Sequence, residues 1–567
     1  MTTTAPRRVL PGRDGGRRHD HGDDGAGLDP ATASTHGRFV GTGRLLRLAL
    51  RRDRVRIPIW AASTAGLIGL SAVSIMDLYE TAEQRLNYAK ISRDNAALIV
   101  QAGPGYGLGG VPSHGAILMN EGAAWTYILV AILGIMMTVR HTRLEEETAR
   151  AELVRSAPVG RHAGAAAGLL AVLVAQVAVA VLVVVSILAS AYGVVGAFAY
   201  GAAMVCVGMA FAAIALVTAQ VAATSRAATG LALAVLGVSF VVRAIGDVSA
   251  PWLSWLSPIH WGQAIRAYAG ERWAVLVVPI VFTAVMLRVA TRLNDRRDFG
   301  AGMLAQRVGR AEATPRLSTV LALAVRLHRG AVIGWGVGIV SLGCFYGIVA
   351  DQAEKMLEDN PDMADFLAGM GGGSITDAFL ATGLLVTGLL AAGFVVSAVL
   401  RMRTEESVGR ADPLLATPVA RATWAASHLG VAMGALVLLM AAGGFAEGVG
   451  AAIVLGDASQ MGRLTAAGLA MAPAPMVLGA VAFLVCTAAP RWALLSWAAM
   501  VLSAAMGLLA EALDLPMWAR DLSPFQHIPA MPAADFALLP VVLLVGVAVA
   551  MAGTGFTALR RRDLGRV

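Results

Sequence analysis

The sequence predicts an all-α transmembrane protein in which one chain carries two tandem halves of six helices each. The first observation behind this prediction is composition: 57% of the 567 residues are hydrophobic and only 14% are charged, whereas a soluble domain has about 25% charged residues. The second is a series of apolar runs long enough for membrane helices, each of which takes ~20 residues. The third is an internal duplication of the polar segments between those runs.

Each half is predicted to cross the membrane six times. The spans of the first half are expected at residues 58–77, 121–141, 163–190, 195–222, 228–246 and 273–293. Those of the second half are expected at residues 331–350, 376–400, 424–450, 464–488, 491–512 and 535–559. The chain is thereby divided into a disordered cytoplasmic tail, a first half, a linker and a second half, at residues 1–42, 43–300, 301–316 and 317–567.

The tail is rich in Arg, Asp, Gly and His and has no apolar periodicity, which is typical of disorder. A metal site at His19 and His21 is an alternative for this tail. Arginines at helical spacing follow between Arg44 and Arg56, in the pattern of a helix that lies in the membrane interface. A second such helix is expected at residues 321–329, before a span that begins near Trp335.

A charged segment of nineteen residues occurs between the second and third predicted spans of both halves. It reads R-L-E-E-E-T-A-R-A-E-L-V-R-S-A-P-V-G-R at residues 143–161 and R-T-E-E-S-V-G-R-A-D-P-L-L-A-T-P-V-A-R at residues 403–421. We call these segments the first and the second island. They align without a gap at an offset of 260, and the identical pairs are Arg143/Arg403, Glu145/Glu405, Glu146/Glu406, Arg150/Arg410, Ala151/Ala411, Pro158/Pro418, Val159/Val419 and Arg161/Arg421. Asp412 replaces Glu152 and keeps the charge.

Two interpretations of the islands are open. Glu146 and Arg150 lie four residues apart, as do Glu406 and Arg410, so each pair is expected to form a local salt bridge. Each island is then either only a short solvated helix held by this bridge and closed by a proline, or a docking surface for another protein in which the local pair is also present. We favour docking because the other loops differ freely between the halves, whereas the islands keep the same pattern.

Two more motifs are repeated. W-L-S-W-L-S-P-I-H-W at residues 252–261 corresponds to W-A-R-D-L-S-P-F-Q-H at 518–527, and D-R-R-D-F-G at 295–300 corresponds to R-R-R-D-L-G at 560–565. Arginine is concentrated in the tail, the islands, the linker and the C-terminal segment, so the positive-inside rule places the islands and both termini in the cytoplasm. Each half then begins and ends inside, which makes the halves parallel repeats.

These motifs resemble the ABC-2-type permeases, and more narrowly the fused twelve-span group known as exporters of polyketide antibiotics, which are multidrug efflux permeases. The resemblance implies a type V exporter-like fold in the plasma membrane and export of hydrophobic or amphiphilic compounds. It also implies that the islands are coupling helices, each touching one of two copies of a cytoplasmic ABC ATPase, with the four matched glutamates nearest to it. The residues so assigned to coupling are Glu145, Glu146, Arg150, Glu152, Pro158, Arg161, Glu405, Glu406, Arg410, Asp412, Pro418 and Arg421.

The sequence contains no phosphate-binding P-loop. Such a loop requires a lysine between Gly and Ser or Thr, and the only two lysines, Lys90 and Lys355, follow Ala and Glu. We therefore expect that the chain is not itself an enzyme, binds no cofactor or metal, and depends on a partner ATPase that binds ATP and Mg²⁺. The basic residues do not form the face of a nucleic-acid-binding domain.

Two other functions fit the composition: an ion-coupled secondary multidrug transporter, and a membrane sensor or scaffold that transports nothing. A secondary transporter needs carboxylates near mid-membrane, whereas the charged residues of the spans are predicted near the span ends. Arg243 is expected to reach the outer interface by snorkelling, and Glu447, near the outer end of its span, is a possible contact on the path of a cationic substrate. An aromatic belt at the outer interface is expected from Trp252, Trp255, Trp261 and Trp518.

Overall fold

The computed structural model describes residues 37–93, 95–297, 300–304, 312, 314–351, 374–509 and 516–562. Helices make up most of this part of the chain and no strand occurs in it, which confirms the predicted all-α class. Two compact units meet in the sequence at residues 306 and 307, inside the predicted linker. The metal hypothesis for the tail lies outside the described residues.

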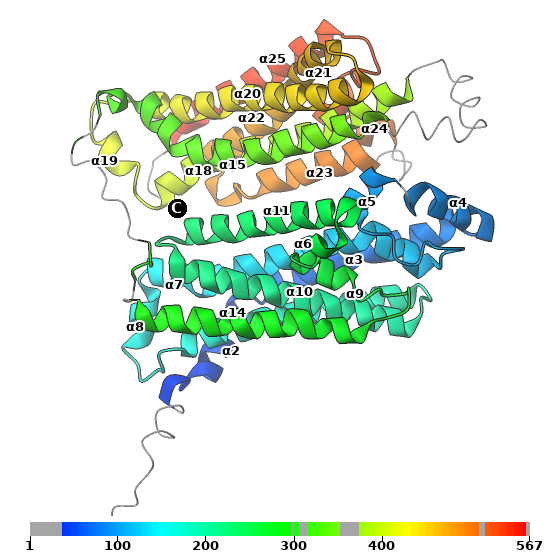
Figure 1. The fold of residues 1–567 in the computed structure, drawn as a ribbon. Coiled ribbons are helices and arrows are strands. Elements are labelled where there is room, and N and C mark those ends of the chain that lie inside the picture. Colours follow the sequence, from blue (N-terminus) through cyan, green and yellow to red (C-terminus); the bar gives the residue numbers. More distant parts are fainter. Residues whose placement is uncertain are drawn as a thin grey trace, which may run out of the picture. The chain divides into compact units, whose positions relative to one another are not determined.

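Six long helices form the body of the first unit and run roughly side by side (Figure 1). They are α3 (Arg56–Leu78), α6 (His114–His141), α9 (Ala163–Ala189), α10 (Val194–Val221), α11 (Ser225–Ser249) and α14 (Val277–Arg296). Shorter helices join or precede them: α2 (Thr42–Arg52), α4 (Ala82–Arg93), α5 (Ala96–Ala102), α7 (Arg143–Glu147), α8 (Arg150–Arg155), α12 (Pro251–Ser254) and α13 (Pro258–Gln263). Helices α7 and α8 lie at one end of the long helices, and α4 lies at the other.

The second unit repeats this plan. Its long helices are α15 (Val320–Ile348), α18 (Ile375–Ser407), α20 (Arg421–Leu455), α21 (Ser459–Met471), α22 (Pro473–Ala488), α23 (Leu495–Leu509) and α25 (Leu538–Arg561). Its short elements include α19 (Asp412–Leu415), α24 (Met517–Arg520) and the 3-10 helix η4 (Pro524–His527). Since α21 and α22 follow each other directly, they form one apolar segment of 30 residues.

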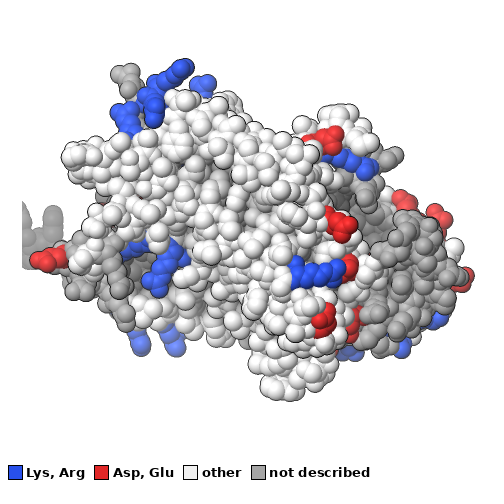
Figure 2. Space-filling view, turned by 90° about the horizontal axis from the view of Figure 1, so that it is seen from above, with Lys and Arg blue, Asp and Glu red and all other residues white. Residues whose placement is uncertain are grey.

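Eleven helical segments of the described chain are long and apolar enough to cross a membrane, six in the first unit and five in the second. The remaining predicted span, at residues 491–512, is represented by α23, an apolar helix of 15 residues beyond which residues 510–515 are not described. On the face drawn in Figure 2, the coloured Lys, Arg, Asp and Glu residues gather toward two ends, and the band between them is nearly free of charge. This distribution fits a bilayer around the middle of the helices.

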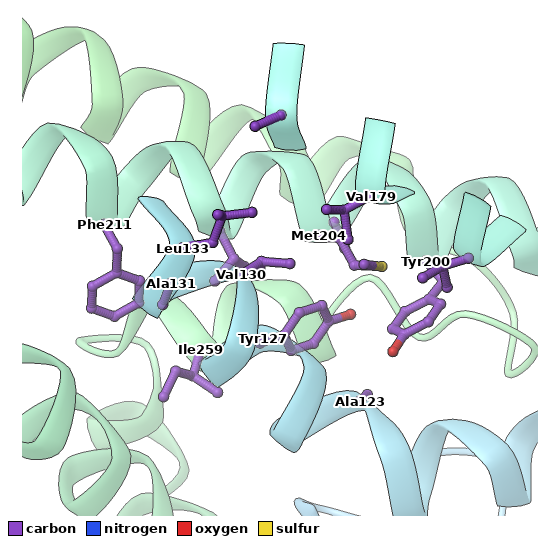
Figure 3. Close-up of a cluster of buried hydrophobic side chains, with 14 of the residues drawn as sticks. Ala123, Tyr127, Val130, Ala131, Leu133, Val179, Tyr200, Met204, Phe211 and Ile259 are labelled. Atoms are coloured by element: carbon purple, nitrogen blue, oxygen red, sulfur yellow. The ribbon is translucent and has the colours of Figure 1, made fainter. Parts of the chain in front are cut away.

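The core of the first unit lies between α6 and α10. Tyr127, Tyr200 and Phe211 are at most 1% exposed there and pack among aliphatic side chains (Figure 3). The buried hydroxyl of Tyr127 donates to the carbonyl of Gly262 at 3.0 Å, so its polar end is satisfied. Large apolar side chains nevertheless remain exposed on outward faces, such as Ile280 of α14 at 57%. So much exposed apolar surface is rare in soluble proteins and fits contact with lipid.

The two predicted interfacial helices differ. In the first unit α2 is separate, and the chain bends between it and α3 around Asp53, whose buried carboxylate contacts His141 at 2.5 Å and Arg140 at 3.4 Å. In the second unit α15 runs unbroken from Val320 to Ile348, so the prediction of a separate helix at residues 321–329 is wrong. No buried carboxylate draws the chain aside there, and the helical hydrogen bonds continue.

The tryptophan belt is also only partly as predicted. Trp252 and Trp518 are 70% exposed and Trp255 is 45% exposed, which suits an interfacial position. Trp261 is 6% exposed instead, because α13 turns it against Phe282, and its Nε1 donates to the carbonyl of Trp255 at 2.7 Å. Its assignment to the belt was wrong.

Candidate coupling site

The islands form short helical turns at one end of each unit. The first island folds as α7 and α8; the second continues from α18 and then forms α19. Both have a left-handed residue at the same aligned position, Ala149 with φ 57° and Gly409 with φ 71°. The last helical turns end at Arg155 and Leu415, three residues before the matched prolines, as the sequence predicts.

Glu146 of the first island binds an arginine from the end of the unit's last long helix. Arg297, the residue directly after α14, donates from Nη2 to Glu146 Oε1 at 2.5 Å and from Nη1 to Glu146 Oε2 at 2.8 Å. The two side chains are 4% and 14% exposed. Arg297 Nε also donates to Gln220 Oε1 at 2.7 Å, at the end of α10. A bidentate pair of this kind fixes both distance and orientation.

The second island repeats this contact. Arg562, directly after α25, forms an ion pair with Glu406, with side chains 16% and 6% exposed. Its Nη1 also donates at 3.1 Å to the carbonyl of Cys486, near the end of α22. Burial, and secondarily the charge of Arg403, lower the pKa of the Arg562 guanidinium from its ordinary value. Arg297 and Arg562 occupy the same position of the repeated R-R-D-x-G motif.

The far ends of the islands are held at the same place. Arg161 Nη2 donates to the carbonyl of Asn294 at 2.6 Å, and its Nε lies 3.6 Å from Asp295. The matched Arg421 donates from Nη1 to the carbonyl of Arg562 at 3.0 Å. Each island is therefore bound at both of its ends to the end of the last long helix in its own unit.

The predicted local salt bridges have different partners. Arg150 lies 3.9 Å from Glu145, and Arg410 lies 3.0 Å from Glu405. The prediction that these arginines pair with Glu146 and Glu406 was wrong, because both of those carboxylates are occupied by distant arginines. Spacing of four residues made the local pair available, but Arg297 binds Glu146 through two hydrogen bonds and Arg562 binds Glu406 through Nη2.

One predicted set of residues thus faces inward and another faces solvent. Glu146, Glu405 and Glu406 are mostly buried, with side chains at most 14% exposed. The side chains of Arg150 and Arg410 are 59% and 57% exposed. The other predicted residues that face outward are Glu152, Pro158, Asp412 and Pro418. Two apolar side chains that sequence reasoning passed over stand among them, Leu153 at 76% and Val408 at 61% exposed.

Arg143 is a further functional candidate that the sequence analysis missed. It is 2% exposed and donates to the carbonyls of Ala223, Gly300 and Ala301 at 2.5 to 3.1 Å. It ties the start of the first island to the segment after α14. The signals that could have found Arg143 and Arg297 were present, since Arg143 recurs as Arg403 and the R-R-D-x-G motif recurs after the last span of each half.

The two charged residues singled out within spans are both buried. Arg243 is 0% exposed, lies 3.5 Å from Asp247, and does not reach an interface by snorkelling, so that prediction was wrong. Glu447 is also 0% exposed, inside α20 rather than at its end. Its carboxylate packs against Gly383 and Tyr346 and has no hydrogen-bond partner among the described residues.

Two bundles of long apolar helices with matched polar islands define a polytopic α-helical membrane protein with an internal repeat. The chain is 37% identical over 534 residues to the multidrug efflux system permease protein Rv1217c of Mycobacterium tuberculosis, and the alignment covers 93% of this chain and 96% of that protein. The family model described as multidrug efflux system permease Rv1217c, C-terminal domain, matches residues 317–560. The chain belongs to this family of multidrug efflux permeases, which confirms the resemblance found in its motifs.

Proposed function

We propose that this chain is the transmembrane subunit of an ABC exporter in the plasma membrane. It expels hydrophobic or amphiphilic compounds, and two copies of a separate cytoplasmic ATPase, which bind ATP and Mg²⁺, dock on the two islands. The observation that carries this proposal is the two-sided construction of both islands: the inward side is bound to the unit by buried ion pairs, and the outward side presents exposed apolar and charged residues.

The outward side has the composition of a docking surface. Leu153 and Val408 offer apolar contact next to the exposed guanidinium groups of Arg150 and Arg410, and arginine is one of the residues in which interface energy is concentrated. The missing Gly-Lys pair supports an ATPase on another chain. Arginine-rich segments on the island side support a cytoplasmic placement of the islands and of both termini.

In this proposal Glu146 and Glu406 act through the chain and not by touching the ATPase. ATP-driven closure of the two ATPase subunits moves the islands, and the islands move the helices to which they are bound. The substrate path then alternates between the two sides of the membrane. Glu447 is buried among α15, α18 and α20, and a role on the path of a cationic substrate requires those helices to separate during transport.

The test is assembly and transport with matched variants. The permease is co-expressed with the ABC ATPase of the same system and purified through a tag on the permease. L153D combined with V408D is expected to lose the ATPase and ATP-dependent dye efflux from membrane vesicles. The control is L256D combined with L522D, two matched leucines that are 65% and 62% exposed outside the islands; it should retain the ATPase.

Retention of the ATPase by the island variant would contradict docking at the islands. Efflux that continues without ATP and stops when the proton gradient is dissipated would favour the secondary transporter instead. Assembly with the ATPase but no efflux of any amphiphilic dye from the vesicles would favour the sensor.

A further inference from the structure

We propose that in each half the island and the inner end of the last span move as one body, joined by the pairs Glu146–Arg297 and Glu406–Arg562. We call each pair a joint. Arg297 and Arg562 are then positioning residues that pass the motion of the islands to the last span. This inference rests on the proposed function, and it gives a role to the R-R-D-x-G motif, which docking alone does not explain.

The joints connect parts of the chain that are far apart in sequence. Glu146 and Arg297 are 151 residues apart, and Glu406 and Arg562 are 156 apart. The islands and the R-R-D-x-G segments are among the motifs that the halves share, while the loops between them differ. A contact made by the same two motif positions in both units accounts for why both motifs persist together.

The two arginines have equivalent local structures. Each is the first residue beyond its helix, with an extended backbone: φ −105° and ψ 150° at Arg297, and φ −101° and ψ 139° at Arg562. The extended residue turns the side chain back toward the island. The chain therefore leaves both helices with the same backbone conformation, and in both units Nη2 of the arginine binds Oε1 of the glutamate.

Each arginine also contacts the end of a third long helix. Arg297 donates to the side chain of Gln220 in α10, and Arg562 donates to the carbonyl of Cys486 in α22. For Arg562 the acceptor is a carbonyl in the last turn of α22, where carbonyl groups lack partners within the helix and an arginine is favourable; for Arg297 the acceptor is a side-chain oxygen. One guanidinium group thus holds together the island, the last helix and a third helix of each unit, which is α10 in the first unit and α22 in the second.

The second attachment of each island turns a single contact into a rigid connection. An island held by a single ion pair can rotate about that pair. An island held at two positions fifteen residues apart cannot. Arg161 and Arg421 supply the second attachment, at Asn294 and at the carbonyl of Arg562. A force applied to the exposed side of an island therefore displaces the end of α14 or α25 with it.

Substitution of the joint arginines tests the transmission of motion. R297Q and R562Q, separately and together, are made in the full permease and purified with the ATPase. The double variant is expected to retain the ATPase while drug-stimulated ATP hydrolysis and efflux fall about tenfold. The matched controls are R296Q and R561Q, which alter exposed neighbours in the same motif and should leave efflux unchanged. Unchanged efflux in R297Q/R562Q, or a loss of the ATPase together with efflux, overturns the inference.

A covalent link between the island and the last span tests whether the two move together, apart from any effect of the substitutions on folding. Cysteines replace Glu146 and Arg297 in a chain whose three native cysteines are replaced by alanine, and a flexible bis-maleimide links them. If the island and the last span move together, the link restores the efflux that the unlinked thiols have lost. If the link leaves efflux abolished, they must move apart and the inference fails. A failure of the unmodified permease to bind the ATPase in the same experiment identifies instead a failure of the proposed function.

Discussion

The two islands share one set of contacts and differ in another. Both bind the last helix of their unit through Glu146 or Glu406. Glu145 and Glu405 share the matched partners Arg150 and Arg410 but differ in their other partner. Glu145 lies 2.7 Å from Arg52 of α2, whereas Glu405 lies 3.4 Å from Arg401, one turn earlier in its own helix. At the offset of 275 that aligns the first spans, the residue matching Arg52 is Leu327. The first island is therefore also attached to the interfacial helix, through a charge that the second half lacks.

The polar layer beside the islands shows the same divergence. In the first unit the ring of His141 contacts Asp53, and in the second unit the rings of His328 and His428 contact each other at 3.1 Å. His428 aligns with Gly168, where an added methyl carbon would come within 2.9 Å of the Cβ of His141. In the first unit the large side chain of His141 faces Gly168, whereas in the second unit the aligned position holds His428. The polar layer therefore consists of different side chains in the two units, while the joints are the same.

The largest loss of stability is expected from breaking the joints, which both units share. Glu146→Gln and Glu406→Gln each leave a mostly buried guanidinium without its carboxylate, and each should lower the free energy of unfolding by about 3 kcal/mol. Denaturation in detergent measures this. Glu152→Gln, at an exposed position of the first island, is the control and should change it by less than about 0.5 kcal/mol. Unequal losses for the two variants would show that the joints are not equivalent.

A smaller effect is expected where the units differ in packing. Gly168→Ala crowds His141 and should destabilise the protein by about 1–3 kcal/mol. Gly164→Ala, one turn earlier in α9 with nothing within 4 Å of the added carbon, should be neutral or stabilising by about 0.5 kcal/mol. If both variants behave alike in detergent denaturation, steric complementarity between Gly168 and His141 does not distinguish the units.

The ion pair between Arg52 and Glu145, which only the first island has, should contribute less to stability than the joints do. Arg52→Gln removes a partly exposed pair and is expected to cost about 1 kcal/mol or less. The visible result should be faster amide hydrogen exchange in α2 and α7 and no change in α19. The aligned change Leu327→Gln removes no ion pair and should leave exchange in the second island as it was. Faster exchange in both islands after Arg52→Gln would refute the asymmetry.

The smallest effect concerns the left-handed residue. Ala149 adopts a positive φ that glycine adopts without steric cost, so Ala149→Gly should stabilise the first island, and Gly409→Ala should destabilise the second, each by about 1 kcal/mol. The changes in the free energy of unfolding of the two variants must have opposite signs. Thermal unfolding of the two variants, measured side by side, tests this.

Several features could be predicted because they depend only on neighbouring residues. The long apolar runs follow from the thickness of a bilayer, and the structure places a helix on each of them. The helical turns of the islands stop before Pro158 and Pro418, because proline restricts the residue that precedes it. The duplication is visible without any structure.

Other features could not be predicted because they depend on what the chain brings together. Arg243 and Glu447 were placed by their distance from span ends, and packing against other helices buried them. Trp261 has the same residue type and the same segment as Trp255, yet α13 turns it inward. Sequence position does not determine which side of a helix meets a neighbour.

For the islands, the sequence by itself determined that two matched charged segments exist, that they lie between membrane spans, and that no P-loop accompanies them. The tertiary structure decided which carboxylate each arginine binds. Spacing along the chain favoured Arg150 for Glu146, four residues away, but folding brought Arg297 close enough to form two hydrogen bonds at once. A buried bidentate pair is stronger than a solvated pair on one helix, and that difference selected the partner.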